Sequence, residues 1–239
     1  ELEAFFKTYA ETGGGVLREY AHNETCGKAL GVGAGEFTPW QPMATGSDIL
    51  FYEGQHGGLV AETWTRRKVD SRHFPPEIDR RVGQKGIDVA QHVDLMIGVV
   101  PAINLEWIQK IHRDMAHGYC SSEESLETIL RRMDDYIHYI VPQFGLTDIN
   151  IQRMPLVDTS NPFIARDVPT PNESVLVIHF RDSRRHNFPD LMRRIPGSTM
   201  SRPTTMVVPG GELKLALEVI CTPLLQEMME KRSEALAAG

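Results

Sequence analysis

Residues 95–114 of the chain read Leu95-Met96-Ile97-Gly98-Val99-Val100-Pro101-Ala102-Ile103-Asn104-Leu105-Glu106-Trp107-Ile108-Gln109-Lys110-Ile111-His112-Arg113-Asp114. The first six residues are apolar without a polar alternation, which is typical of a strand that is buried on both faces. Pro101 ends this strand, and Asn104 is placed to cap a helix over residues 105–116. An apolar strand that leads directly into an amphipathic helix is a building unit of α/β proteins, so this stretch predicts an α/β fold.

Strand-like and helix-like segments alternate over much of the remaining chain. Strand-like runs lie at 16–22, 48–52, 149–157, 174–180 and 204–208. Helical periodicity covers residues 1–12, about 121–137 and about 212–235, and Ser121 and Glu124 form a capping box at the start of the second of these. The glycine- and proline-rich segment 23–47 predicts a loop. Since no linker divides the chain, we expect one layered α/β domain over residues 1–239.

The segment 61–90 differs in composition from the rest of the chain. It is polar, with Pro75-Pro76 in the middle and the pairs Arg66-Arg67 and Arg80-Arg81 on either side. Exposed loops tolerate insertions better than packed elements do. We therefore expect residues 61–90 to form an inserted excursion on the surface.

The composition of the chain excludes several classes of protein. Of its 239 residues, 41% are hydrophobic and 24% charged, which is ordinary for a globular protein. The net charge of −7 argues against a nucleic-acid partner, because phosphate-coating proteins usually carry a basic excess. No apolar run approaches the roughly 20 residues of a membrane span, so no membrane partner is expected. Three widely spaced cysteines without a CxxC motif favour a reducing, cytoplasmic location.

The first residues of the chain already have helical spacing. Leu2, Phe5, Phe6 and Tyr9 form an apolar stripe, and neither an initiating Met nor a capping residue precedes them. A natural domain seldom begins in the middle of a helix. This pattern leads us to expect that an N-terminal part is missing and that the chain is a fragment.

The helix predicted over 105–116 carries a row of charged residues. Glu106, Lys110 and Asp114 share one face at spacings of four, and Arg113 lies beside them. One interpretation is a solvated face with two ion pairs, which contribute little to stability. The other is a site in which two cations hold phosphate and one carboxylate serves proton or metal chemistry. The spacing alone leaves both interpretations open.

Two further positions fit either a functional or an ordinary structural role. Glu53 follows the strand-like run 48–52, and a carboxylate at the carboxyl end of a strand can hold Mg²⁺. The spacing alone favours an ordinary acid at a strand end over a metal ligand. The adjacent pair Arg131-Arg132 fits an exposed helix face or a fork for phosphate oxygens.

Several sequence motifs that would assign a chemistry are missing from the chain. No GxxxxGK[ST], HExxH or GxSxG occurs in it. The run Gly31-Val32-Gly33-Ala34-Gly35-Glu36 lacks the last glycine of GxGxxG and follows no clear strand. These 239 residues therefore contain neither a phosphate loop nor a dinucleotide fingerprint.

Long runs of the sequence closely resemble the bacterial phosphoribulokinase family. These runs are Phe51-Tyr52-Glu53-Gly54-Gln55-His56-Gly57, the stretch 98–114 quoted above, Val141-Pro142-Gln143-Phe144, Thr147-Asp148-Ile149-Asn150 and Val157-Asp158-Thr159-Ser160-Asn161-Pro162-Phe163-Ile164-Ala165-Arg166. The likeness covers nearly the whole chain except about residues 61–88.

The resemblance implies a fold, a reaction and its cofactors. The fold is an α/β P-loop kinase-like layered fold with a mixed β-sheet. The reaction transfers the γ-phosphoryl group of ATP, with Mg²⁺, to O1 of ribulose 5-phosphate, giving ribulose 1,5-bisphosphate for carbon fixation in the Calvin cycle. Family members of this kind are expected to be cytoplasmic homo-oligomers.

The resemblance also implies roles for particular residues. The catalytic candidates are Lys110, Arg113 and Asp114, with Asp114 as a base or an organiser of the metal. The metal candidates are Glu53 and Asp114. The candidates for binding substrate are Tyr20, His22, Lys110, Arg113 and Arg132. Arg202 lies where the bacterial enzymes respond to an allosteric effector.

The sequence departs from the family pattern in ways that leave alternatives. The family's phosphate loop and principal catalytic aspartate would lie before Glu1, so we expect this chain alone to be poorly active. The run Met115-Ala116-His117-Gly118-Tyr119 looks one residue short and lacks a family arginine, and His179 stands where many relatives carry an arginine. The alternatives are a non-catalytic homologue acting as a regulatory or oligomerising subunit, and a module that only binds a sugar phosphate.

Overall fold

The computed structural model describes residues 1–43, 46–59, 88–117, 121–164 and 166–238. Its elements, in chain order, are α1 (Leu2–Thr12), β1 (Val16–Leu17), α2 (Glu24–Leu30), β2 (Gln41–Pro42), β3 (Ile97–Pro101), α5 (Ile103–Ala116), α6 (Ser122–Arg131), α7 (Met133–Asp135), a π-helical turn (Tyr136–Ile140), α8 (Val141–Phe144), β4 (Ile149–Pro155), β5 (Ser174–Phe180), α9 (Phe188–Arg194), β6 (Thr199–Arg202), β7 (Thr205–Pro209) and α10 (Leu213–Ala238). The prediction of alternating strands and helices in an α/β fold is confirmed.

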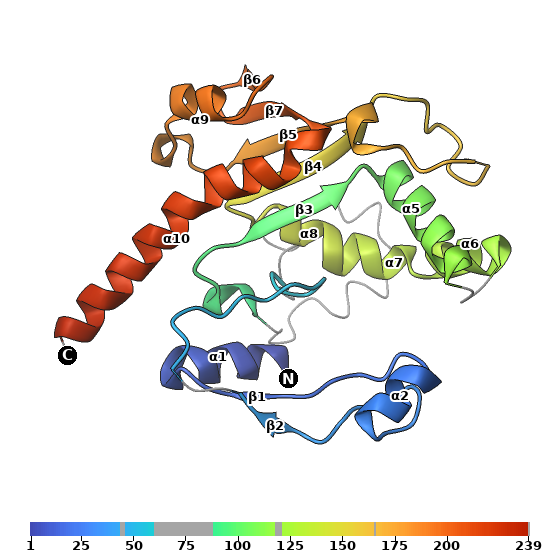
Figure 1. The fold of residues 1–239 in the computed structure, drawn as a ribbon, viewed down its shortest axis with the longest axis horizontal. Coiled ribbons are helices and arrows are strands. Elements are labelled where there is room, and N and C mark those ends of the chain that lie inside the picture. The colour runs from blue at the N-terminus through green and yellow to red at the C-terminus, as the bar shows by residue number, and fades with distance from the viewer. Residues whose placement is uncertain (44–45, 60–87, 118–120, 165, 239) are drawn as a thin grey trace, which may run out of the picture.

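A mixed five-stranded sheet forms the centre of the molecule (Figure 1). Its strands follow the order β3-β4-β5-β7-β6. β3 and β4 are parallel, and every other neighbouring pair is antiparallel. The connection between β3 and β4 contains α5 to α8, as a parallel pair requires a long crossover.

The main hydrophobic core lies between one face of this sheet and helices α9 and α10. Alternate residues of β4, β5 and β7 point into it, as the two-residue period of a strand dictates. The buried side chains are Ile149, Ile151, Leu176, Ile178, Phe180, Met206 and Val208 from the strands and Leu191, Ile195, Ala216, Val219, Ile220 and Leu224 from the helical side. Burial of this apolar surface is the dominant favourable term that holds the sheet to α10.

The helices between β3 and β4 and the N-terminal elements lie on the other side of β3 (Figure 1). Leu105, Ile108 and Ile111 form the buried stripe of α5. α1, α2 and the short β1–β2 ribbon lie beyond these helices (Figure 1). Phe6 of α1 contacts Tyr52 with a distance of 5.3 Å between ring centroids. α1 also contacts the 3₁₀ turn Ala90–His92, where Gln91 Nε2 donates to Glu3 Oε1 at 3.4 Å.

Residues 48–52 do not form the predicted strand. They run as irregular backbone, and the side chain of Phe51 is 85% exposed. A strand needs a neighbour that accepts and donates backbone hydrogen bonds. In the described part of the chain no strand lies beside this segment, so its apolar composition does not produce sheet structure.

The segment 23–47, predicted as loop, contains the helix α2. Its N-cap Asn23 accepts a hydrogen bond from the backbone N–H of Cys26 at 2.9 Å. Gly31 ends it in the left-handed conformation, with φ of 72°. The glycines that indicated a loop therefore include the residue that terminates a short helix.

Two predicted helix boundaries also differ from the structure. α5 begins at Ile103 with Ala102 at its N-cap, and the side chain of Asn104 instead donates to the carbonyl of Thr159 at 3.0 Å. The helix opened by Ser121 and Glu124 has the predicted capping box but ends at Arg131 rather than near 137. α9 and β6 were not predicted, because both are short and lack a long apolar pattern.

The predicted excursion 61–90 falls largely outside the described residues. At its described end, Val89 is 1% exposed, so this residue is buried rather than exposed as predicted. Its backbone N–H donates to the carbonyl of Leu59 at 2.8 Å, which holds the two ends of the segment together.

Within the described residues, no helix combines the length and the apolar character that crossing a membrane requires.

Candidate functional site

The last two turns of α5 carry two cations, Lys110 and Arg113, beside the nearly buried carboxylate of Asp114. The side chain of Asp114 is 9% exposed, and its Oδ2 lies 2.6 Å from Lys110 Nζ. The Arg113 Nε lies 3.6 Å from Asp114 Oδ1. Ser125 of α6 donates its hydroxyl to Oδ2 at 3.0 Å. The structure thus brings together the three predicted catalytic candidates.

Asp114 is ionised at neutral pH because its partners outweigh its burial. Burial raises the pKa of this carboxyl group, but the hydrogen bonds from Lys110 and Ser125 and the charges of Lys110 and Arg113 bring it below its ordinary value. A carboxylate with a lowered pKa is a weak proton acceptor. In this conformation Asp114 is therefore better suited to holding cations than to removing a proton.

Glu106, on the same face of α5, has a different partner from the one predicted. Its carboxylate accepts a hydrogen bond from the Tyr136 hydroxyl at 3.2 Å. Burial raises the pKa of Glu106, and burial together with the negative charge of Glu106 raises the pKa of Tyr136 to about 12. Of the two ion pairs predicted on this face, the described contacts contain only that between Lys110 and Asp114.

Tyr20 and His22 form a second, separate pair. They follow β1, and their rings meet edge to face with 4.9 Å between centroids. Tyr20 forms an isolated bridge with Phe37, which fixes the backbone at this point. Both side chains are exposed, so they can contact a ligand.

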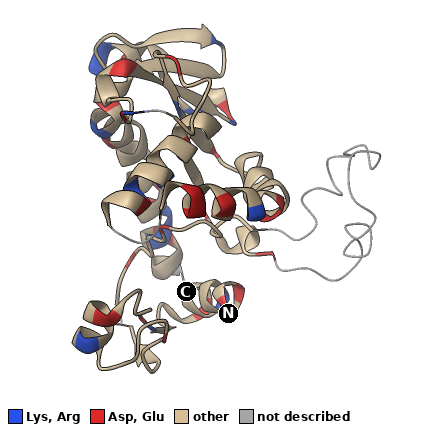
Figure 2. Ribbon diagram, turned by 90° about the vertical axis from the view of Figure 1, so that its right-hand side faces the viewer, with Lys and Arg blue, Asp and Glu red and all other residues tan. Residues whose placement is uncertain are grey.

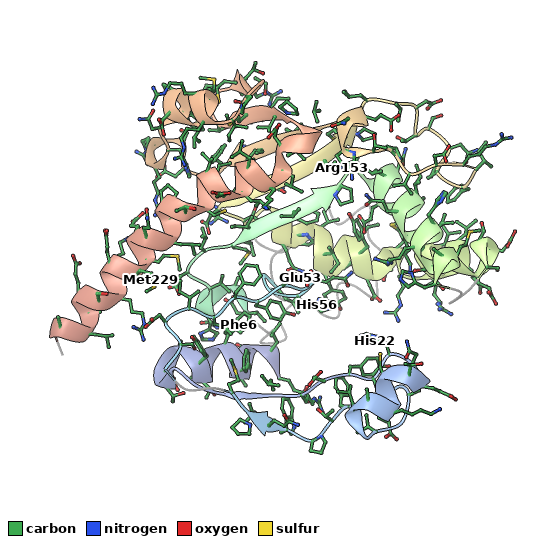
Figure 3. The ribbon with its side chains drawn as sticks, viewed as in Figure 1. Phe6, His22, Glu53, His56, Arg153 and Met229 are labelled. Carbon is green, nitrogen blue, oxygen red and sulfur yellow. The ribbon has the colours of Figure 1, made fainter. Side chains whose placement is uncertain are left out.

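Glu53 lies on an exposed loop that bridges the layers. Figure 3 shows that Glu53 and His56 come from the same loop, whereas His22 lies on the side of α2. No described hydrogen bond or ion pair engages the Glu53 carboxylate. The loop itself is fixed from α8, because Gln143 Nε2 donates to the Gln55 carbonyl at 2.8 Å and its Oε1 accepts from Gly58 N–H at 2.9 Å.

The two predicted arginines outside α5 lie apart from the Asp114 cluster. Arg132 is the C-cap of α6, and its side chain is 72% exposed and 3.9 Å from Asp135. Arg202 is in β6, at the edge of the sheet opposite β3. Four strand spacings, about 19 Å, separate these two edges. Within the described contacts, neither arginine touches Lys110, Arg113 or Asp114.

Of the two predicted metal ligands, Glu53 fits that role and Asp114 does not. Magnesium is usually bound by one or two carboxylates together with phosphate oxygens and water. Glu53, exposed and without a described partner, fits such a ligand. Asp114 does not fit in this conformation, since its Oδ2 already accepts from Lys110 and Ser125. Among the described residues, no group of three or more His, Cys, Asp or Glu side chains gathers to hold a metal.

Sequence reasoning missed Ser125 and Gln143. Ser125 lies at the fifth position from the cap of α6, and nothing in the spacing indicates its contact with Asp114. Gln143 falls in a run that resembles the family, but its partners lie 85 and 88 residues earlier in the chain. Figure 2 shows basic and acidic residues side by side on the middle helices. Ser125 and Gln143 are neutral, so the distribution of charge does not point to them.

Comparison with known proteins identifies the family of the chain. The profile of the Phosphoribulokinase / Uridine kinase family matches residues 1–160. The phosphoribulokinase of Nitrobacter vulgaris is 48% identical over 98% of this chain and 73% of its own length. The chromosomal phosphoribulokinase of Cupriavidus necator is 46% identical, with the same two coverages of 98% and 73%.

A solved structure of a relative has the same fold as this chain. Phosphoribulokinase from Rhodobacter spheroides superposes with a TM-score of 0.77 at 45% identity, over 97% of this chain and 73% of that one. The α/β P-loop kinase-like fold with a mixed sheet is thereby confirmed. The comparisons lend no support to a non-catalytic subunit, and the segment expected before Glu1 stays a prediction. The chain belongs to the phosphoribulokinase/uridine kinase family.

Proposed function

We propose that this chain is the kinase that transfers the γ-phosphoryl group of ATP to O1 of ribulose 5-phosphate. The observation that carries the proposal is the pair of cations, Lys110 and Arg113, held by the ionised Asp114 at the end of α5. Relatives that are 48% and 46% identical and named phosphoribulokinase support the choice of substrate.

Lys110 and Arg113 supply the positive charge that phosphoryl transfer requires. The reaction spreads negative charge over the phosphoryl oxygens, and its catalysis consists mainly of alignment and charge neutralisation. The side chains of Lys110 and Arg113 are 33% and 63% exposed, so both can reach a ligand while one side remains attached to Asp114. The negative end of the α5 dipole further stabilises cations at this position.

Asp114 acts in this proposal by orienting the two cations. Its lowered pKa keeps it charged, and its contact with Ser125 fixes the carboxylate against α6. Asp114 would bind a metal only after its contact with Lys110 is released.

Glu53 is the proposed protein ligand for Mg²⁺. The Glu53 carboxylate would hold the ion, which would supply positive charge to offset that of the ATP phosphates. Glu53 holds a single negative charge toward solvent on a loop whose backbone is anchored. Tyr20 and His22, together with Arg132, are proposed to contact the sugar phosphate.

Arg202 is proposed to respond to an anionic effector rather than to substrate. Arg202 of β6 and His179 of β5 both pair with Thr205 of β7, which lies between those two strands. Residues directly opposite one another in a sheet project to the same face, so Arg202 and His179 flank Thr205 there. The distance of this row from α5 fits a regulatory site.

The test of the proposal is ADP release by the whole protein in the presence of ATP, Mg²⁺ and ribulose 5-phosphate. Ribose 5-phosphate serves as the control sugar. Arg113→Ala should raise the KM for ribulose 5-phosphate about tenfold, because it removes one charged fork from the phosphate. Arg184→Ala, whose side chain is 90% exposed and pairs only with nearby Asp182 in the described contacts, is the matched control.

Two outcomes would contradict the proposal. One is ADP release that does not depend on ribulose 5-phosphate. The other is an Arg113→Ala variant whose KM equals that of Arg184→Ala, which would remove Arg113 from the substrate site.

A further inference from the structure

The side chain of Gln143 joins helix α8 to the loop that carries Glu53 and His56. Its Oε1 accepts the N–H of Gly58 at 2.9 Å. Its Nε2 donates to the carbonyl of Gln55 at 2.8 Å and to the carbonyl of Tyr139 at 2.7 Å. Gln143 is 8% exposed, so these hydrogen bonds form with little competition from water.

Only glutamine makes this set of three contacts without rearrangement. The amide has one acceptor oxygen and two N–H donors, and each of the three takes part. A glutamate in the same place keeps the shape and the acceptor but loses both donors. An aliphatic residue keeps the volume but loses all three hydrogen bonds, including the buried one from Gly58, whose loss is costly.

The helix fixes where the Gln143 amide lies. Pro142 has no N–H to donate to the preceding turn, and the chain before it adopts a π-helical turn over Tyr136–Ile140. In that turn the N–H of Val141 donates to the carbonyl of Tyr136, five residues back. The carbonyl of Tyr139 then accepts the Gln143 side chain, which holds the amide against its own helix.

The loop side of the contact is equally constrained. Gly58 is buried, and a Cβ at this position would lie 2.6 Å from Met96 Sδ and 3.3 Å from Gln143 Oε1. The absence of a side chain therefore allows this close approach. The following residue, Leu59, accepts the N–H of Val89 at 2.8 Å. The backbone of 55–59 is thus held from two directions, while Glu53 and His56 remain exposed.

We infer that Gln143 is a positioning residue that fixes the loop 53–58 and, through it, the Glu53 carboxylate. It does not touch substrate or the reacting atoms. Its role rests on the proposed function, because the loop is useful to catalysis only if Glu53 serves the phosphoryl transfer. The loop is nevertheless anchored by Gln143 whether or not that function holds, and the two claims can be tested separately.

The first test measures the loop itself by hydrogen exchange in the whole protein. Gln143→Leu and Gln143→Glu should each speed backbone exchange in residues 53–59 by about tenfold or more. Each variant removes side-chain donors or acceptors of residue 143 that hydrogen-bond to that segment. Exchange in β4 and β5 should stay as in the wild type. Gln226→Leu, at an exposed position of α10, is the matched control and should change neither region.

The second test separates positioning from general stability through kinetics. Both Gln143 variants should lower kcat about tenfold and raise the Mg²⁺ concentration needed for half-maximal activity, as loss of an orienting partner does. The KM for ribulose 5-phosphate should remain within about twofold of the wild-type value, since the sugar contacts lie elsewhere.

Each result either supports the inference or overturns it. Unchanged exchange in 53–59 in both variants would show that Gln143 does not anchor the loop. Faster exchange in an active enzyme whose kcat and Mg²⁺ requirement are unchanged would also overturn the positioning role. If the wild type shows no sugar-dependent turnover, the proposed function fails, and the exchange result still decides whether Gln143 holds the loop.

Discussion

Asp114 shows how a nearly buried acid can remain charged. Its carboxylate loses contact with water but gains Lys110, Ser125 and the nearby Arg113. A buried charge is tolerated only when it is paired and hydrogen-bonded. The same contacts that stabilise the carboxylate also restrict Lys110 and Arg113, so the charge serves both folding and the orientation of cations.

Replacing Asp114 with Asn should lower both activity and stability. Asp114→Asn keeps the shape of the side chain and an acceptor for Ser125, but it removes the charge that holds Lys110. We expect kcat to fall about tenfold or more and the free energy of unfolding near pH 7 to fall by about 2 kcal/mol. Steady-state kinetics and urea unfolding measure the two effects.

The stability effect of Asp114→Asn should depend on pH in one direction. The folded pKa of Asp114 lies below its ordinary value, so the charged form stabilises the fold above about pH 4 and loses that effect as the pH falls through the folded pKa. The difference between wild type and variant should therefore shrink below about pH 4. Asp167→Asn, an exposed control, should show no such trend. A difference that grows in acid would contradict this account.

At the residue scale the sequence could predict local contacts and could not predict distant ones. The i, i+4 spacing correctly indicated the contact between Lys110 and Asp114. Ser125 and Gln143 were not found, because their partners lie in other elements and are brought close only by the fold. Glu106 shows the same limit, since Tyr136, 30 residues away, replaces its predicted partner.

Helix α6 depends on the contacts at its first turn. The Ser121 hydroxyl accepts the N–H of Glu124 at 3.2 Å, and the Glu124 carboxylate accepts the N–H of Ser121 at 2.7 Å. These two bonds satisfy donors that the helix cannot pair internally. α6 in turn carries Ser125 to Asp114, so the cap supports the site indirectly.

Ser121→Ala should destabilise the protein modestly. Loss of the cap is expected to cost about 1 kcal/mol, which corresponds to a fall in Tm of about 2–4 °C for a chain of this size. Differential scanning calorimetry measures the change. Ser160→Ala, at an exposed serine that caps no helix, should shift Tm by much less. Equal shifts for both variants would remove the capping box as a source of stability.

At the element scale, prediction succeeded where a pattern was long and met its partner. The runs at 174–180 and 204–208 became β5 and β7, because both lie between neighbours in the sheet. The equally apolar run 48–52 has no strand beside it among the described residues and stays irregular. Strand formation thus depends on a neighbour that composition cannot reveal.

The whole molecule consists of layers that are joined unequally. The sheet and α10 share a continuous core, and no residue of 1–43 belongs to it. Phe6 is 5% exposed and packs against Tyr52. The Tyr9 hydroxyl lies 2.8 Å from Ser47 Oγ. Regions with few buried contacts open more readily than the core of a protein does.

Phe6→Ala should therefore loosen the N-terminal layer without unfolding the sheet. Truncating a buried Phe costs about 3–5 kcal/mol, which is large for a layer held by few contacts. Hydrogen exchange should become faster in residues 1–43 and remain unchanged in β4 and β5. Phe51→Ala, at a side chain that is 85% exposed, is the control and should alter neither region. Equal acceleration in the sheet would mean that the layers unfold as one unit.

The mixed connectivity of the sheet also has a consequence for the order in which the chain folds. β6 and β7 are joined by a short turn, so their pairing closes only a small loop. Ile97 of β3 must instead find Ile149 of β4, and the entropy lost in closing a loop grows with its length. We expect the β6–β7 hairpin to form early. β3, and with it the start of α5 and the Asp114 cluster, should join last, so the candidate catalytic residues take their places only after the sheet that supports them is complete.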